Sequence, residues 1–202
     1  MENYYYSKNP NVEHDEKYWN FELLGHDLAF VTDNGVFSKN TVDYGWRVLL
    51  NALATTELTG AILDVGCGYG PIGLTMAKLA PQGQTLMVDK DFMAVEYSNK
   101  NAALNKLSNA KAMLSNGFQH IDKNLRFDVI ASNIPAKVGK EMMSILLHDM
   151  QRHLKPGGRV YLVTINGLRE YMKRNLKDTF GNFDKLKQGA AYTVSYAEKR
   201  WD

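Results

Sequence analysis

A glycine-rich run between Asp64 and Gly73 contains the residues of this sequence that are best suited to holding a ligand. The run reads Asp-Val-Gly-Cys-Gly-Tyr-Gly-Pro-Ile-Gly. Glycines in a turn between a strand and a helix let the backbone approach a bound molecule closely. The spacing is not that of a dinucleotide-binding loop, because Pro71 stands where the third glycine would be, and no Gly-Lys-Ser/Thr follows as in a nucleoside-triphosphate loop. The carboxylate of Asp64 is unfavourable beside a pyrophosphate, so the run predicts a site for a cationic ligand.

Residues 64–70 closely resemble the first motif of the class I methyltransferases that use S-adenosylmethionine (SAM). In that family the loop packs against the methionine part of SAM, and an acidic residue after the next strand accepts hydrogen bonds from both ribose hydroxyls. The resemblance implies that Asp89 has the ribose role and that Lys90 lines the adenine. It also implies cofactor contacts for five loop residues: Asp64, Gly66, Cys67, Gly68 and Gly70. On the residues alone, the loop can instead be a tight turn and Asp89 the cap of a helix that begins at Phe92.

A second polar turn, at Ser115-Asn116-Gly117, follows the third predicted strand. The family commonly has an aspartate at the position of Asn116, where it accepts a hydrogen bond from the adenine amino group. The carboxamide oxygen of Asn116 can accept the same bond, and Gly117 permits close approach. The resemblance therefore implies cofactor contacts for Asn116 and Gly117, and the alternative is an ordinary polar turn.

The segment Asn133-Ile134-Pro135-Ala136 follows the fourth predicted strand and is the candidate for the chemistry. Methyltransferases that act on exocyclic amino groups of nucleobases have Asn/Asp-Pro-Pro and an aromatic residue here. A carboxamide oxygen and a backbone carbonyl that accept the two N–H bonds of such an amine turn its lone pair toward the methyl group. The resemblance implies catalytic roles for Asn133, Ile134 and Pro135, and a cofactor contact for Asn133. Ile134 replaces a proline of the family motif and Ala136 replaces the aromatic residue, so one alternative is an altered or lost activity. The other alternative is that the segment is a turn with no chemical role.

The segment from Gly35 to Leu50 has a more specific resemblance. It is similar to the region that precedes the SAM fold in small-subunit rRNA guanine-N2 methyltransferases of the C type, in the single-domain branch. In those relatives Phe-Ser and Asp-x-Gly cover the cofactor from one side, which implies cofactor contacts for Phe37, Ser38 and Asp43. Those relatives usually have a serine at the position of Trp46. The alternative is a plain loop followed by a helix cap.

These motifs need elements that bring the ends of several strands together. Strands are predicted at 61–65, 85–88, 111–114, 127–131 and 159–165, and helices at 71–79, 92–107, 138–154 and 168–180. A hairpin over 18–37, a helix over 46–54 and a strand pair at 183–187 and 192–197 complete the pattern. The alternation indicates an α/β fold: a Rossmann-like, seven-stranded, mainly parallel sheet with an antiparallel edge pair and an N-terminal β-hairpin extension. Ligands of such sheets bind beyond the carboxyl ends of the strands, near the switch in strand order.

The predicted organisation is a flexible arm over 1–17 and a single methyltransferase domain over 18–202. Within it, 18–45 is the hairpin and cofactor-covering segment and 46–202 the SAM-binding fold. A chain of 202 residues, 45% of them hydrophobic, buries enough surface to fold without staples. The single cysteine excludes an internal disulfide framework, and scattered histidines predict no metal site. No membrane helix or signal peptide is recognisable, so we expect a soluble, cytoplasmic protein.

The net charge of +2 combines two unequal parts. Residues 1–135 contain 11 basic and 15 acidic residues, a net −4, whereas residues 136–202 contain 13 and 7, a net +6. A basic C-terminal third favours an anionic partner, although an ordinary solvated surface explains it as well. A basic row on one predicted helix can bind phosphates or be a solvated face. The row consists of Arg169, Lys173, Arg174 and Lys177.

Taken together, the features predict a SAM-dependent N-methyltransferase that modifies the exocyclic amino group of a guanine in ribosomal RNA. The cofactor is SAM, and the partner is RNA, in particular that of the small subunit. One alternative is a methyltransferase for a small molecule or a protein. Another is a non-catalytic module that binds SAM or RNA and has a degenerate Asn-Ile-Pro-Ala motif.

Overall fold

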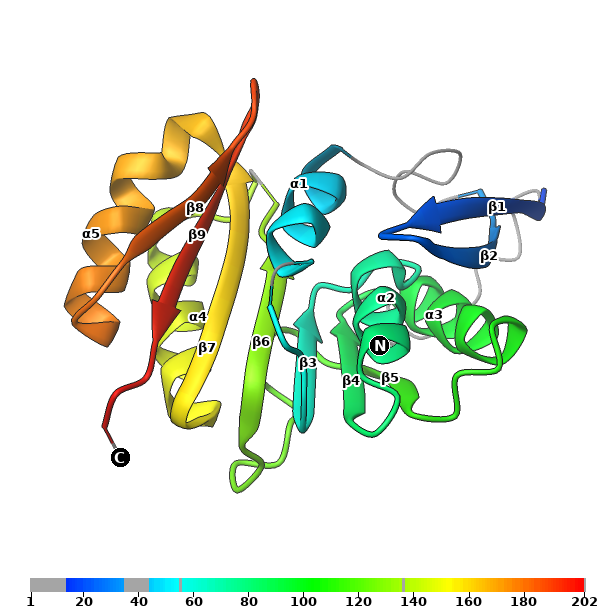
Figure 1. Cartoon of the computed structure of the whole chain (residues 1–202), viewed down its shortest axis with the longest axis horizontal. Helices are drawn as coiled ribbons and strands as arrows, with labels where there is room; N and C mark the ends of the chain where they lie inside the picture. The colour runs from blue at the N-terminus through cyan, green and yellow to red at the C-terminus, as the bar shows by residue number, and fades with distance from the viewer. Residues whose placement is uncertain (1–13, 35–43, 55, 136, 202) are drawn as a thin grey trace, which may run out of the picture.

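The computed structural model describes residues 14–34, 44–54, 56–135 and 137–201, and its centre is a seven-stranded sheet (Figure 1). The strand order is β5-β4-β3-β6-β7-β9-β8; the first five are parallel, and β9 is antiparallel to both β7 and β8. The strands are β3 (Ala61–Val65), β4 (Gln84–Asp89), β5 (Ala110–Leu114), β6 (Phe127–Asn133), β7 (Leu154–Ile165), β8 (Asp184–Gln188) and β9 (Tyr192–Glu198). The predicted Rossmann-like fold class with its antiparallel edge pair is confirmed.

Helices cover both faces of the sheet and bury two separate cores. One core joins α1 (Tyr44–Leu53), α2 (Pro71–Leu79) and α3 (Phe92–Leu104) to one face, and the other joins α4 (Lys140–His153) and α5 (Arg169–Phe180) to the opposite face. Strand β6 shows the alternation that a two-sided sheet requires, since Ala131 enters the first core and Ile130 the second. None of the described helices is long and apolar enough to cross a membrane.

The boundary between α4 and β7 differs from the prediction. Gly157 and Gly158 were expected to separate a helix from a strand that starts at Arg159, but β7 already begins at Leu154. The backbone of Lys199 accounts for the difference, because its carbonyl accepts from Gly157 N at 2.6 Å and its N–H donates to Gly158 O at 2.8 Å. Pairing with a segment distant in sequence therefore extends the strand through glycines.

A two-stranded hairpin, β1 (Lys17–Leu23) and β2 (His26–Thr32), packs beside α3 and α2 (Figure 1). Its turn, Leu24-Gly25, has two positive φ angles, 53° and 75°, as a type I′ turn requires. The predicted hairpin is confirmed over these residues. Its rings reach the glycine loop, since Trp19 and Phe30 lie 5.9 and 5.6 Å from the ring of Tyr69. The hairpin is thus part of the wall around the carboxyl ends of the strands.

Candidate functional site

The predicted site segments meet where the strand order switches direction, between β3 and β6. From β3 the chain proceeds outward to β4 and β5 on one side, and from β6 to β7 on the other. Val65 at the end of β3 is in register with Val88 of β4 and with Ser132 of β6. Four segments lie at the ends of the inner strands: 66–70 after β3, 89–91 from the last residue of β4, 115–117 after β5 and 133–135 from the last residue of β6. They share the carboxyl edge of the sheet, which is where such folds bind ligands.

The glycine loop leaves open space at this edge. Gly66, Gly68 and Gly70 have φ angles of 73°, 56° and 104°, which L-residues with side chains rarely adopt. A Cβ atom added at Gly66 would meet nothing within 4 Å, and one at Gly68 would meet Trp46 at 3.8 Å. The N–H groups of Gly66 and Cys67 donate to Val88 O at 2.8 and 3.0 Å, so the loop is fixed to β4. The result is a backbone cradle, tied to β4, that no side chain of the loop fills.

Asp89 is held in a single orientation beside this cradle. Its Oδ2 accepts from Gly68 N at 3.0 Å, and its Oδ1 accepts from Asp91 N at 2.9 Å. Burial raises the pKa of Asp89 above its ordinary value, and these two backbone donors oppose the shift. The cap of α3 is Asp91, whose Oδ1 accepts from Met93 N at 2.9 Å. The sequence left open whether Asp89 caps the helix, and the structure assigns that role to Asp91.

Asp64 is fully buried beneath the loop and only half satisfied. Its Oδ2 accepts from Gly73 N at 2.9 Å, while its Oδ1 has no hydrogen-bond partner among the described residues. Burial raises the pKa of Asp64 to about 7; the N–H of Gly73 opposes this shift, and the charge of Asp89 adds to it. A cation at the cradle would favour the ionised form, so the residue suits a positively charged ligand.

The side chain of Cys67 belongs to the packing of the loop. Its thiol is buried, with Sγ 3.5 Å from Ser98 Oγ. Burial raises the pKa of this thiol well above its ordinary value, which disfavours the reactive thiolate. Ser98 in turn donates to Gly68 O at 2.7 Å. Helix α3 therefore supports the loop from behind, and a contact of Cys67 with a ligand stays a prediction.

The turn after β5 is tied to Asp89 through Ser115, which the prediction did not single out. Ser115 N donates to Asp89 O at 2.9 Å, and its hydroxyl donates to Gly117 O at 2.7 Å. Gly117 has a φ of 57°, a left-handed conformation that favours glycine over residues with side chains. Asn116 is exposed at the same edge, and so is Lys90 after β4. Both are therefore accessible to a ligand on the cradle.

Asn133 ends β6 and lies half-buried in register with Val163 of β7. The next residue, Ile134, is 3% exposed and packs in the core under α4, and its N–H donates to Val163 O at 3.0 Å. Pro135 is exposed, and its carbonyl accepts from Val138 N at 3.1 Å. Ile134 thus fixes this loop by packing and by an N–H bond that a proline could not make.

Trp46 is a site residue that the sequence-based prediction missed. It lies in the first turn of α1, is 3% exposed, and its ring is 5.2 Å from that of Tyr69. Together with its approach to Gly68, this makes the indole a wall of the cradle. Its position directly after the Asp-x-Gly motif was the available signal. Phe37, Ser38, Asp43 and Ala136 lie outside the described residues.

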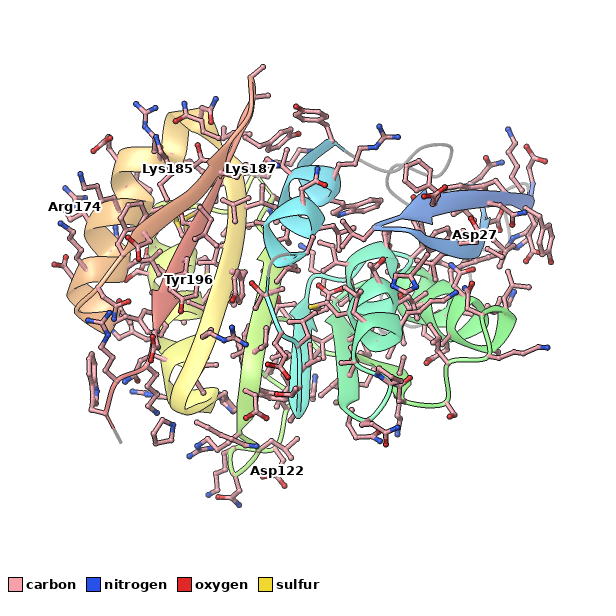
Figure 2. The ribbon with its side chains drawn as sticks, viewed as in Figure 1. Asp27, Asp122, Arg174, Lys185, Lys187 and Tyr196 are labelled. Carbon is pink, nitrogen blue, oxygen red and sulfur yellow. The ribbon has the colours of Figure 1, made fainter. Side chains whose placement is uncertain are left out.

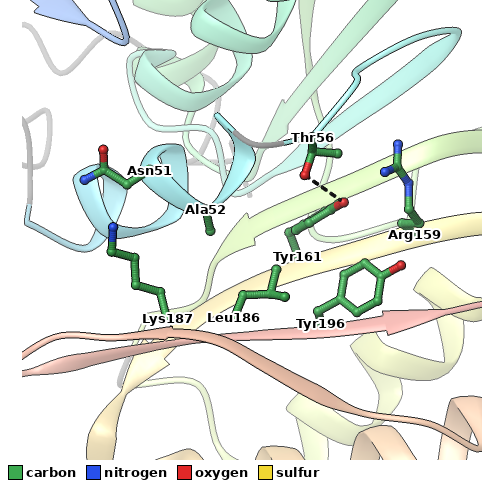
Figure 3. A pocket seen from close by; sticks show the side chains of 8 residues that line it. All are labelled: Asn51, Ala52, Thr56, Arg159, Tyr161, Leu186, Lys187 and Tyr196. Carbon is green, nitrogen blue, oxygen red and sulfur yellow. Dashed lines mark hydrogen bonds between the residues drawn. The ribbon is translucent and has the colours of Figure 1, made fainter.

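A separate groove of about 490 Å³ lies between α1 and the strands β7, β9 and β8 (Figure 3). Lys187 and Leu186 point from β8 toward α1, and the ring of Tyr196 on β9 lies beside that of Tyr161, with centroids 5.2 Å apart. None of the predicted site residues lines this groove. The lining residues are Asn51, Ala52, Thr56, Arg159, Tyr161, Leu186, Lys187 and Tyr196.

Comparison with known proteins agrees with this geometry. The family model described as "Methyltransferase small domain" matches residues 27–196. The chain belongs to this methyltransferase family. SAM is the cofactor of the family. The sequence-based predictions of the methyltransferase family and of its cofactor are therefore confirmed.

Three relatives show how far the similarity extends within the methyltransferase small domain family. The protein named "Uncharacterized protein YbxB" of Bacillus subtilis (strain 168) is 39% identical over 163 residues, which cover 81% of each chain. The "Ribosomal RNA small subunit methyltransferase C" of Citrobacter koseri is 35% identical over 183 residues, 89% of this chain and 52% of that protein. The solved 16S rRNA N2 G1207 methyltransferase of T. thermophilus, in complex with AdoMet and guanosine, matches with 30% identity and a TM-score of 0.85. That match covers 96% of this chain and 53% of the other, so this chain spans about half the length of the rRNA methyltransferases it matches.

Proposed function

We propose that the protein transfers the methyl group of SAM to the exocyclic amino group of a guanine in ribosomal RNA. The observation that carries the proposal is the position of Asn133, a half-buried carboxamide one strand away from the glycine cradle. The relatives named as rRNA methyltransferases support the choice of substrate. An rRNA substrate also agrees with the cytoplasmic location expected from the sequence.

The residues around the cradle fit SAM. The open space at Gly66 can take the methionine part, and the unpaired Oδ1 of Asp64 suits its positive charge. Asp89 would accept from the ribose hydroxyls, and Asn116 from the adenine amino group, with Gly117 and Lys90 beside it. Phe37, Ser38 and Asp43 would cover the cofactor from one side. When bound, SAM supplies a methyl group on a sulfonium, which is already an activated leaving group.

Asn133 would act by orienting the amine. Its Oδ1 accepts one N–H of the guanine amino group, and the carbonyl of Ile134 accepts the other, which aims the nitrogen lone pair at the methyl carbon. In the transfer, the N–C bond would form as the S–C bond breaks with a neutral thioether as the leaving group, and the nitrogen would then release a proton to water. The contribution is positioning and electrostatics, so no strong base is needed.

Transfer of a labelled methyl group from SAM to small-subunit rRNA tests the proposal, with naked RNA and assembled subunits as separate substrates. We expect Asn133→Ala to lower the rate by about 100-fold or more while the SAM affinity measured by calorimetry changes little. Asn124→Ala, in an exposed loop, is the matched control. SAM binding with no methyl transfer to either substrate would overturn the proposal and leave a methyltransferase for a small molecule or a protein, or a non-catalytic module. Mapping of rRNA methylation in cells with and without the protein gives the nucleotide.

A further inference from the structure

Two cations from different helices lie against one tyrosine ring on the α4–α5 side of the molecule. Lys140 Nζ is 5.5 Å and Arg174 Cζ is 5.8 Å from the ring centroid of Tyr171. The hydroxyl of Tyr171 donates to Lys140 O at 2.5 Å, which joins the first turn of α5 to the first turn of α4. Cation–π contacts hold both charges in place without neutralising them. We define the basic patch as Lys140, Arg174 and Tyr171 together with the exposed Lys137.

The basic patch adjoins the loop proposed to carry the chemistry. Lys137 and Lys140 stand two and five positions after Pro135 in the sequence, and the hydrogen bond from Val138 N to Pro135 O holds the connecting turn. Helix α5 starts after β7 at the same carboxyl edge, and Arg174 projects from its outer side (Figures 1 and 2). A strand of nucleic acid whose base reaches Asn133 must therefore place neighbouring phosphates near this edge.

The charges on the two sides of Asn133 indicate on which side the nucleic-acid strand lies. On the cofactor side, Asp89 and Asp91 stand against Lys90 at and just after the end of β4. On the other side none of the ion pairs found among the described residues involves Lys137, Lys140 or Arg174, and the nearby Glu170 pairs with Arg169 at 3.4 Å. A polyanion is repelled by the first side and attracted by the second.

We propose that the basic patch binds phosphate groups of the RNA strand next to the target nucleotide. This inference rests on the proposed function, because it assumes that the target base reaches Asn133. It also assigns a role to part of the basic row that the sequence shows on α5. Lys140 and Arg174 contact phosphates, while Tyr171 keeps their side chains in position.

The test measures binding of deproteinised small-subunit rRNA to the full chain in filter assays at several salt concentrations. The variant is Lys140→Gln/Arg174→Gln. Its matched control is Lys111→Gln/Lys123→Gln, which removes the same charge from two exposed positions. These positions lie at the edge of the sheet where the parallel strands begin, and Figure 2 labels Asp122 in the loop that contains Lys123. We expect the patch variant to lose about tenfold in affinity and the salt slope to fall by about 1.4, at about 0.7 per phosphate contact on a single strand. The control should stay within about twofold of the wild type.

Two further measurements separate the possible failures. SAM affinity should be equal in all three proteins, since the patch lies outside the cradle. If the wild type methylates rRNA but the patch variant and the control bind RNA equally well, the patch is wrong and the proposed function stands. If the wild type neither binds nor methylates rRNA, both proposals are wrong.

Discussion

The carboxamide of Asn101 makes both hydrogen bonds that a neighbouring strand would make to Val31. Its Oδ1 accepts from Val31 N at 2.7 Å and its Nδ2 donates to Val31 O at 3.1 Å. Asn105, one helical turn later, does the same for Ala29, at 2.8 and 2.7 Å. Nδ2 of Asn101 also donates to Tyr69 O at 2.9 Å. One buried side chain thus connects the hairpin edge to the glycine loop, and two asparagines satisfy an edge that is otherwise unpaired.

Replacing Asn101 with leucine should destabilise the protein by about 3 kcal/mol, because it leaves buried backbone groups of Val31 and Tyr69 without partners. The free energy of unfolding from denaturant titration measures the effect. SAM affinity should fall as well, since the loop loses a support. The control is Asn124→Ala on an exposed loop, for which we expect less than about 0.5 kcal/mol. Equal stability of both variants would show that these hydrogen bonds contribute nothing.

Two glycines of the loop region should respond differently to alanine. A Cβ at Gly73 would lie 2.4 Å from Met87 Cγ, so Gly73→Ala should cost about 2–3 kcal/mol of stability. A Cβ at Gly66 meets nothing within 4 Å, so Gly66→Ala costs about 1–2 kcal/mol for its φ of 73°. That methyl group would, however, enter the proposed cofactor space and lower SAM affinity by about tenfold or more. Thermal denaturation and calorimetry of both variants separate the two effects, and unchanged SAM affinity of Gly66→Ala would contradict the cradle.

Local signals explain where the sequence predicted the structure well. Helix α2 has the predicted bounds, 71–79, because Pro71 suits the first helical turn and a glycine with positive φ precedes it. The segments after the strands were identified because parallel strands place their carboxyl ends at one edge. The start of β7 was missed because its partner, Lys199, is more than 40 residues away. The roles of Asn101 and Trp46 were missed for the same reason, since each depends on a distant segment.

The acid sensitivity of the N-terminal region should depend on Asp33. Burial favours its neutral form, but hydrogen bonds from His14 and from backbone N–H groups outweigh that effect and lower the pKa of Asp33 to about 2. The folded pKa lies below the unfolded value of 3.8, so the stabilisation is present above pH 3.8 and is lost as the pH falls through 2. The melting temperature of Asp33→Asn should therefore be well below that of the wild type at pH 6, and the difference should shrink toward pH 2. A gap that does not depend on pH would contradict this assignment. Asp15→Asn, at an exposed neighbour, is the control.

Binding of SAM should be coupled to the ionisation of Asp64. Because burial raises its pKa to about 7 from 3.8, Asp64 stabilises the fold fully below pH 3.8, and this contribution is lost as the pH rises through 7. A cation in the cradle lowers that pKa, so binding at pH 6 should release up to about one proton, and binding at pH 8.5 almost none. Calorimetry in buffers with different ionisation enthalpies measures the release directly. Asp64→Asn, which cannot titrate, should bind with no release at either pH and should be more stable than the wild type at pH 8.5. If wild type and variant release the same number of protons at pH 6, another group titrates and Asp64 does not face the charge of the cofactor.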